Sequence, residues 1–274
     1  MWSRNKANLY IQDAMAEFEP DLKYPYASPP AQYRIYRNKL EVTHLVGFGS
    51  GVSGAAASSL SFSSGNYMTF AGHADFSIAS GALWCLDLWA YWTGTPSNYY
   101  LYDFSNQGAG WTESDRIYFR EDAGNMQVGW NNANFLDGGS NPAGDTWTHI
   151  ALTHNADDLI VLYVDGTSVV SGTDTNAIDL TDATPSYQLN WGRGVGSAWH
   201  HNGYLDEMRI SNGAIRWTSN FTPSSVPYVS DSYTKMLIHC NEVVVGGNFT
   251  DSGNTGHTMT LHGSCSQNTA IAKM

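Results

Sequence analysis

The sequence is poor in charge, and poorest in positive charge. Charged residues make up 14% of its 274 residues, and Asp and Glu outnumber Lys and Arg by 25 to 13, which gives a formal net charge of -12. Because such a surface repels a phosphate backbone, we expect no nucleic-acid partner. Cysteine is also scarce, since Cys85, Cys240 and Cys265 are the only three and are not spaced as zinc ligands. They exclude a disulfide framework and indicate free thiols in a reducing cytoplasm.

Long apolar runs are missing as well. The richest apolar window is Leu83–Trp92, and Asp87 interrupts it. Met1–Lys6 is not followed by an apolar stretch of signal-peptide length. The sequence therefore predicts no membrane insertion.

Glycine and aromatic side chains are plentiful. Hydrophobic residues make up 42% of the chain, aromatic residues make up 13%, and there are 27 glycines. The apolar share is large enough to bury a core. Many glycines and aromatics with few charges are typical of short strands joined by tight turns.

Short alternating segments run from about Leu60 to Tyr228. In Trp84–Trp92 both alternating sets are largely apolar, which predicts a central strand covered on both sides. Leu159–Val164 and Thr167–Val170 flank Asp165-Gly166, a pair that suits a two-residue hairpin turn. The pattern predicts an all-β fold, an antiparallel β-sandwich of the jelly-roll kind. Further strands are expected at Leu60–Phe62, Tyr67–Phe70, Arg116–Arg120, Met126–Trp130, Thr146–Leu152, Tyr187–Trp191 and Tyr204–Ile210.

Residues 1–43 differ from the rest because prolines and tyrosines punctuate them. A segment of this composition cannot bury itself, so it is either an extended arm that packs on another surface or a disordered tail. We interpret it as an N-terminal anchoring arm.

Several segments, in order, resemble one known family, the laminin-G-like or concanavalin-A-like jelly rolls. Ser59–Met68 is similar to the family's opening strand pair, and Trp84–Trp92 to its broad central strand. Trp147–Gly166 gives the most specific resemblance, and Gly203–Ser211 resembles the closing strand. The resemblance implies a jelly-roll domain, which we place at residues 44–228.

Asn212–Pro223 resembles the version of this domain found in bacteriophage virion proteins of tails, fibres and capsid decoration. In such proteins a second copy often follows, and Thr234–His239 resembles its opening strand. An apolar strand left unpaired would be an aggregation hazard. Residues 229–274 are therefore expected to complete either this sandwich or that of a neighbouring subunit.

The resemblance extends to laminarinase-like glucanases, whose retaining chemistry needs two carboxylates about 5–5.5 Å apart. Their Glu-x-Asp-x-x-Glu arrangement is absent here. Glu113 and Asp115 lie among turn residues, and the adjacent Asp206 and Glu207 would point to opposite faces of a strand. The sequence therefore predicts that the protein is not an enzyme.

Sugars bind to aromatic faces beside polar side chains. The glycan-binding candidates lie in or next to expected loops, although the same aromatic residues could instead cover sheet edges. They are Trp111, Trp130, Asn131, Asn132, Trp199, His200 and Asn202.

Many relatives in the resembling family bind calcium through oxygen ligands in rim loops, which implies a possible calcium cofactor and no other. The carboxylates available for it are Asp103, Asp137, Asp165 and Asp206, but the spacing does not assemble them. For Asp206 a hydrogen bond within a strand bulge is the alternative role.

Together these patterns predict a non-catalytic structural protein of a phage virion, placed in the tail, a fibre or the capsid surface. We expect it to assemble in the host cytoplasm, to bind other virion proteins through residues 1–43, and to form homo-oligomers. Host-surface glycans are the expected further partners. The alternative is a free carbohydrate-binding protein or a glucanase-like enzyme.

Overall fold

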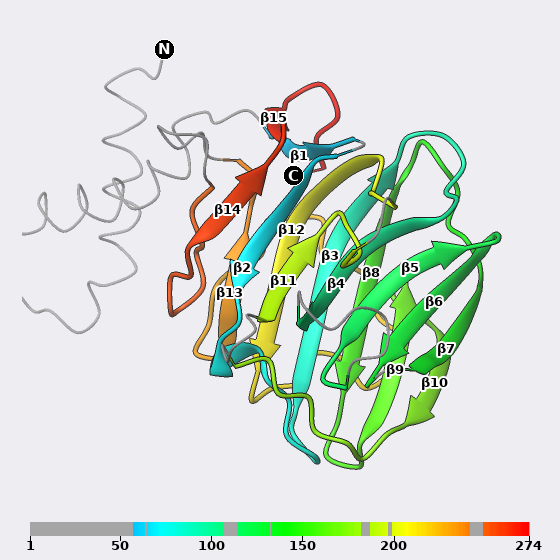
Figure 1. Ribbon diagram of the computed structural model, residues 1–274, viewed down its shortest axis with the longest axis vertical. Coiled ribbons are helices and arrows are strands. Elements are labelled where there is room, and N and C mark those ends of the chain that lie inside the picture. The colour runs from blue at the N-terminus through cyan, green and yellow to red at the C-terminus, as the bar shows by residue number, and fades with distance from the viewer. Residues whose placement is uncertain are drawn as a thin grey trace, which may run out of the picture. The chain divides into compact units, whose positions relative to one another are not determined.

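The computed structural model of the chain (Figure 1) describes residues 57–63, 65–106, 114–131, 133–181, 187–196, 199–241 and 249–273. They belong to one compact unit, Ala55–Met274. The expected arm, residues 1–43, lies outside the described residues. Within the described part of the chain, no helix is long and apolar enough for a membrane span.

Two antiparallel sheets stack face to face, which confirms the predicted all-β sandwich (Figure 1). Sheet A consists of β1 (Ser59–Phe62), β3 (Trp84–Trp92), β8 (Trp147–His154), β9 (Leu159–Val164), β10 (Thr167–Thr173), β12 (Gly203–Asn212), β13 (Thr234–Ile238) and β15 (Ser266–Asn268). Sheet B consists of β2 (Tyr67–Ala71), β4 (Tyr99–Asn106), β5 (Ile117–Asp122), β6 (Asn125–Trp130), β7 (Ala133–Ser140), β11 (Tyr187–Trp191) and β14 (Met259–His262). A short 3-10 helix, η2 (Ala74–Phe76), follows β2.

The strand order places β3 in the middle of its sheet. Sheet A runs β10-β9-β8-β3-β12-β1-β15, with β13 also paired to β12, and sheet B runs β14-β2-β11-β4-β5-β6-β7. One face of β3 sends Trp84 and Leu88 into the core between the sheets, where Trp84 meets Trp130 of sheet B edge to face. The opposite face carries Cys85 and Asp87, which are also buried. The expectation that this strand is covered on both sides is therefore confirmed.

The hairpin between β9 and β10 forms at Asp165-Gly166, as the sequence predicts. Both residues have positive φ, 49° and 75°, which is the backbone that a two-residue turn needs. The Asp165 carboxylate accepts a hydrogen bond from the backbone N–H of His149 at 2.8 Å. The turn is thereby fixed to the neighbouring strand β8.

The C-terminal strands pair with strands of the same chain in both sheets. β13 pairs with β12 and β15 pairs with β1 in sheet A, while β14 pairs with β2 in sheet B. Of the two alternatives for residues 229–274, these pairings correspond to completion within one chain.

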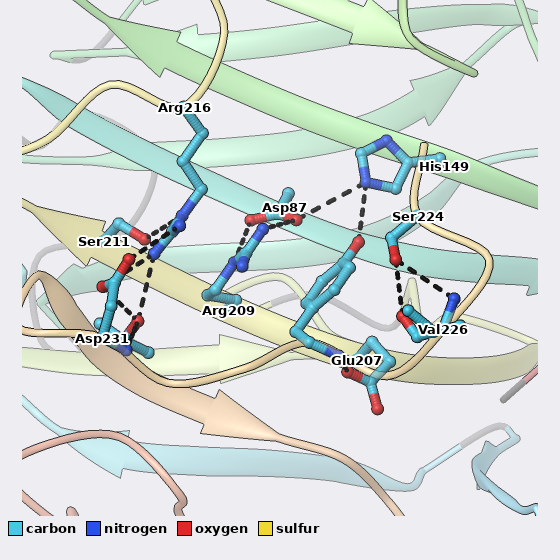
Figure 2. A network of polar contacts seen from close by, with 11 residues as sticks. Asp87, His149, Glu207, Arg209, Ser211, Arg216, Ser224, Val226 and Asp231 are labelled. Carbon is cyan, nitrogen blue, oxygen red and sulfur yellow. Dashed lines mark hydrogen bonds and ion pairs between the residues drawn. The ribbon is translucent and has the colours of Figure 1, made fainter. Parts of the chain in front are cut away.

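A network of buried charges lies on the outer face of sheet A (Figure 2). Arg209 of β12 donates two hydrogen bonds to the carboxylate of Asp87 on β3, at 2.9 and 2.8 Å. His149 Nε2 lies 3.6 Å from the same carboxylate and 2.9 Å from the hydroxyl of Tyr228. Burial alone would raise the pKa of Asp87, but the Arg209 cation and the hydrogen bond with His149 outweigh it and lower that pKa. Asp87 is therefore an ionised carboxylate inside the protein.

The residues after β12 cover this network. We call residues 213–233 the covering segment. Trp217 and Phe221 stack with ring centroids 4.0 Å apart. Arg216 donates two hydrogen bonds to Asp231, each of 3.2 Å, which closes the segment on itself (Figure 2). The part of the outer face of sheet A around Asp87 is thus covered by the chain's own residues.

Replacing Arg209 by Met should lower the free energy of unfolding by about 3–5 kcal/mol, because Asp87 would lose the cation that compensates its charge in the interior. The double variant Asp87→Asn/Arg209→Met should lose less stability than Arg209→Met alone, since it no longer contains the buried carboxylate charge of Asp87. Urea unfolding at pH 7, followed by tryptophan fluorescence, measures both. A loss below about 1 kcal/mol for Arg209→Met would contradict the paired-charge account.

Candidate functional site

Polar and aromatic side chains gather on the outer face of sheet B. In β2, Met68 and Phe70 enter the core, and the alternation of the strand turns Tyr67 outward. In β5 the same alternation turns Tyr118 and Arg120 outward. This face is the one opposite to the inter-sheet core, on the strands drawn from β14 to β7 in Figure 1.

The chain between β11 and β12 folds over part of this face. An isolated bridge pairs Arg193 with His200, which brings the two ends of the loop together. The ring of Trp199 lies 6.2 Å from that of Tyr100 on β4, measured between centroids. A Cβ at Gly194 would lie 2.6 Å from the Tyr100 ring, so only glycine permits this close approach.

Tyr67 is the centre of the first group of contacts. His262 of β14 stacks on it in parallel at 4.1 Å, and the guanidinium of Arg193 lies over its ring at 4.0 Å. His262 Nε2 is 2.9 Å from the hydroxyl of Thr69. Burial and the nearby Arg193 cation lower the pKa of His262, so this imidazole is neutral at pH 7. A neutral imidazole can both donate and accept hydrogen bonds.

Arg120 is the centre of the second group. It donates to the side-chain oxygen of Gln127 at 2.9 and 2.7 Å and pairs with Asp122 at 2.9 Å. Its guanidinium carbon is 5.9 Å from the Trp199 ring and 5.7 Å from the Tyr118 ring. These contacts hold Arg120 and Trp199 in fixed positions on the face.

A buried ion pair fastens the loop to the sheet. Arg116 donates to both carboxylate oxygens of Asp103, at 2.9 and 2.6 Å, and the Ser105 hydroxyl donates to one of them at 3.0 Å. The backbone N–H of Val195 donates to the other oxygen at 2.8 Å. Asp103 therefore has a structural role in placing Arg193 and the residues around it.

We call the half-buried side chains of this face the polar–aromatic patch. They combine ring surfaces with hydrogen-bond donors whose directions are fixed, which is the combination that carbohydrate sites use. The members of the patch are Tyr67, Arg120, Arg193, Trp199, His200 and His262.

Two of the glycan candidates from the sequence, Trp199 and His200, belong to the patch. The side-chain oxygen of Asn131 accepts a hydrogen bond from Asp115 N at 3.2 Å, in the turn after β6. Asn202 precedes β12, and its carbonyl accepts a hydrogen bond from Thr93 N. The structure therefore places Trp199 and His200 on the patch, gives the Asn131 side chain a role in a turn, and pairs the Asn202 backbone with Thr93.

Trp130 belongs to the core instead of a loop. It is 0% exposed and stacks on the buried ring of His154 at 5.4 Å. Its side chain points inward because it continues the alternation of Met126 and Val128 along β6. The remaining candidates, Trp111 and Asn132, lie outside the described residues.

The calcium candidates are distributed over both sheets. Asp103 is bound to Arg116, Asp137 is exposed on β7, and Asp165 holds the β9–β10 turn. Asp206 is buried in β12 beside a register shift, and its carboxylate accepts a hydrogen bond from the next backbone N–H at 2.8 Å. Among the described residues, no cluster of three metal-ligating side chains includes any of them.

A different cluster does form in the described part of the chain. His73, Asp75 and His257 place one ligand atom each within 4.8 Å of one another. The sequence motif His73-x-Asp75 is visible locally, but His257 is brought to it only by the pairing of β14 with β2. Sequence reasoning therefore missed this cluster.

The patch also contains residues that the sequence did not single out. Tyr67, Arg193 and His262 come from three distant segments, and the pairings β2–β11 and β14–β2 bring them together. The outward position of Tyr67 next to the inward Met68 was the one local signal that could have found it.

Three acids on the strands of sheet B are neutralised or turned away. Asp103 is bound to Arg116 and Asp122 to Arg120. The side chain of Glu121, which precedes Asp122 on β5, points into the core and is 0% exposed. Burial raises the pKa of Glu121 to about 8, against a smaller opposite effect of the Trp92 indole. Glu121 is therefore a neutral carboxylic acid at pH 7.

A laminin G family model, that of the concanavalin A-like lectin/glucanases superfamily, matches residues 62–219. This match covers more than half of the chain, and the chain belongs to that family. The family relationship expected from Trp84–Trp92, Trp147–Gly166 and Gly203–Ser211 is confirmed.

Solved structures share the fold at low identity. A candidate carbohydrate-binding protein from Bacteroides ovatus ATCC 8483 aligns with a TM-score of 0.52 and 12% identity, over 78% of this chain and 60% of that one. The chain thus spans about three fifths of that protein's length. The CBM40 of the Ruminococcus gnavus IT-sialidase gives a TM-score of 0.42 and 14% identity, over 54% and 90% of the two chains. A heptameric SAP-like pentraxin from Limulus polyphemus gives 0.42 and 11%, over 76% and 95%. The comparison with curated proteins gave no match.

The raised pKa of Glu121 predicts a pH dependence of stability. Between the unfolded pKa of about 4.3 and the folded pKa of about 8, the folded state binds the extra proton, so stability falls as pH rises through this range. Between pH 5 and pH 8 the free energy of unfolding of the wild type should fall by about 3 kcal/mol more than that of Glu121→Gln, whose amide does not titrate. Urea midpoints at the two pH values measure the difference. Equal losses for both proteins would refute the neutral-acid assignment.

Proposed function

We propose that the chain is a non-catalytic carbohydrate-binding protein whose ligand lies on the polar–aromatic patch of sheet B. The observation that carries the proposal is the half-buried ring of Trp199 beside Arg120, on the same face as the group that Arg193, His200 and His262 form around Tyr67. The membership of the chain in a lectin and glucanase family supports the same class of ligand.

The patch has the chemistry that a sugar requires. The C–H face of a pyranose packs on an indole or phenol ring, and its hydroxyls need donors and acceptors at the ring edge. The half-buried side chains of Arg120, Arg193 and His200 carry such groups on this face.

The absence of catalysis remains part of the proposal. A retaining glycosidase needs one carboxylate as nucleophile and another carboxyl group as acid. On the described strands of sheet B, Asp103 and Asp122 each pair with an arginine, and Glu121 faces the core. This pattern favours binding over hydrolysis.

The finer part of the proposal is a place on a phage particle, in the tail, a fibre or the capsid decoration. It rests on the resemblance of Asn212–Pro223 and Thr234–His239 to virion proteins, with residues 1–43 as the segment that contacts other virion proteins. Homo-oligomers would then present several patches to host-surface glycans, which raises avidity. The alternative is a free carbohydrate-binding protein or a glycan-active enzyme.

Binding of the intact protein to a printed glycan array tests the patch. Trp199→Ala should weaken the best glycan hit about tenfold, or about 1.4 kcal/mol, because the ring surface is lost. Tyr233→Ala is the matched control, since Tyr233 is an aromatic residue 47% exposed on the covering segment. An equal loss in both variants, or an array without a hit, would contradict the assignment of the patch.

The virion placement has a separate test. Mass spectrometry of purified particles of the encoding phage should find the chain in many copies per particle. A chain that stays in the soluble fraction and still binds glycan would reject the virion placement and leave the carbohydrate-binding protein. Turnover of β-glucan by the purified protein would reject the non-catalytic reading.

A further inference from the structure

A second cluster of functional groups lies where η2 meets the loop between β13 and β14. Asp75 Oδ2 is 3.3 Å from His73 Nδ1 and 3.1 Å from His257 Nε2. The rings of His73 and His257 lie 4.8 Å apart, between centroids. The cluster is independent of the patch proposed for carbohydrate.

The distances are those of a metal coordination sphere. Zinc binds imidazole nitrogen and carboxylate oxygen at about 2.0–2.2 Å, so two ligands of a tetrahedral site lie about 3.3 Å apart. The distances from Asp75 Oδ2 to His73 Nδ1 and to His257 Nε2 both agree with this value. Small movements of the three side chains would therefore suffice to enclose an ion.

His73 has a fixed place in the cluster. It is the N-cap of η2, and its Nδ1 accepts a hydrogen bond from Asp75 N at 3.1 Å. Because Nδ1 has a single lone pair, a metal ion bound there would replace this N–H as its partner.

The surroundings hold the other two ligands in place. The Thr255 hydroxyl donates to Asp75 Oδ2 at 2.6 Å. The backbone N–H of His257 donates to Asp251 at 2.7 Å, and the His257 ring packs against Phe76 at 4.5 Å. Such outer contacts orient metal ligands and raise the affinity of a site.

We propose that His73, Asp75 and His257 form a binding site for one divalent transition-metal ion, of which Zn²⁺ is the representative. Two imidazoles and one carboxylate suit this class, whereas Ca²⁺ takes six to eight oxygen ligands. His73 is half-exposed, which leaves the fourth position open to water. The ion would fasten the loop before β14 to η2, and so attach the C-terminal segment to the rest of the sandwich.

Calorimetric titration of the untagged full chain with ZnCl₂, after removal of metal with a chelator, tests the site. We expect one Zn²⁺ per chain and a higher Tm in its presence, because the ion binds the folded state. A parallel titration with CaCl₂ should give no saturable binding at this site.

Two variants assign the ligands. His73→Asn keeps an acceptor for Asp75 N but removes the imidazole, and Asp75→Asn removes the anionic oxygen. Each should weaken Zn²⁺ binding at least tenfold with an unchanged β-type circular dichroism spectrum. Asp137→Asn is the matched control, because Asp137 is exposed on β7 and outside the cluster, and it should bind Zn²⁺ as the wild type does.

Three results would overturn the proposal. The first is the absence of saturable Zn²⁺ binding to the wild type. The second is Zn²⁺ binding that both His73→Asn and Asp75→Asn leave unchanged. The third is saturation by Ca²⁺ that Asp75→Asn abolishes, with no response to Zn²⁺.

Discussion

The buried carboxylate of Asp87 is the constraint on which the architecture depends. It lies in the middle of the central strand, 0% exposed, where a charge is tolerated only with a partner. Arg209 of the adjacent strand supplies the opposite charge. Its guanidinium carbon lies 4.0 Å from the centre of the Tyr228 ring. The Asp87–Arg209 ion pair therefore depends on β12, which carries Arg209, and on the covering segment, which lies over the pair. Without β12 the Asp87 charge would have no cation beside it, and without the covering segment the pair would be exposed to solvent.

The path of β12 is adapted to this pair. Between Asp206 and Arg209 the register with β3 shifts by one residue, and Glu207 takes a positive φ of 50°. The shift lets Arg209 face Asp87 while the Glu207 carboxylate accepts a hydrogen bond from Tyr228 N at 2.6 Å. At the same point, the strand that pairs with β12 on the side away from β3 changes from β1 to β13. One bulge thus aligns the ion pair, holds the covering segment and creates the place where the C-terminal strand enters.

The sequence predicts the features that depend on local alternation and turn chemistry. The apolar alternation of Trp84–Trp92 and the turn at Asp165-Gly166 are local, and the structure has both as predicted. Asp87 was visible as an interruption, but its partner is 122 residues away and no local pattern identifies it. Trp130 ends an expected strand beside a loop, and its alternation with Val128, which turns it into the core, is the local signal against a binding role.

The candidate sites were less predictable because they are assembled by strand pairing between distant segments. Trp199 and His200 could be found as an aromatic and polar run, whereas Tyr67, Arg193 and His262 meet only through β11, β2 and β14. A local pattern identifies neighbours in a hairpin, such as β9 and β10, but not which strands from distant segments lie side by side. The order of strands in the sheet decides the composition of the patch.

The two faces of the sandwich consequently differ in what they can do. The covering segment occupies the outer face of sheet A around Asp87, whereas the described residues of the patch on sheet B leave half-buried rings and donors at the surface. The family match ends at residue 219, yet Tyr228, His257 and His262 all follow it. Tyr228 lies over the guanidinium of Arg209, His262 stacks on Tyr67 in the patch, and His257 contacts Asp75. Because these three contacts come from the residues after the family match, both the buried ion pair and the two candidate sites depend on how that C-terminal segment packs.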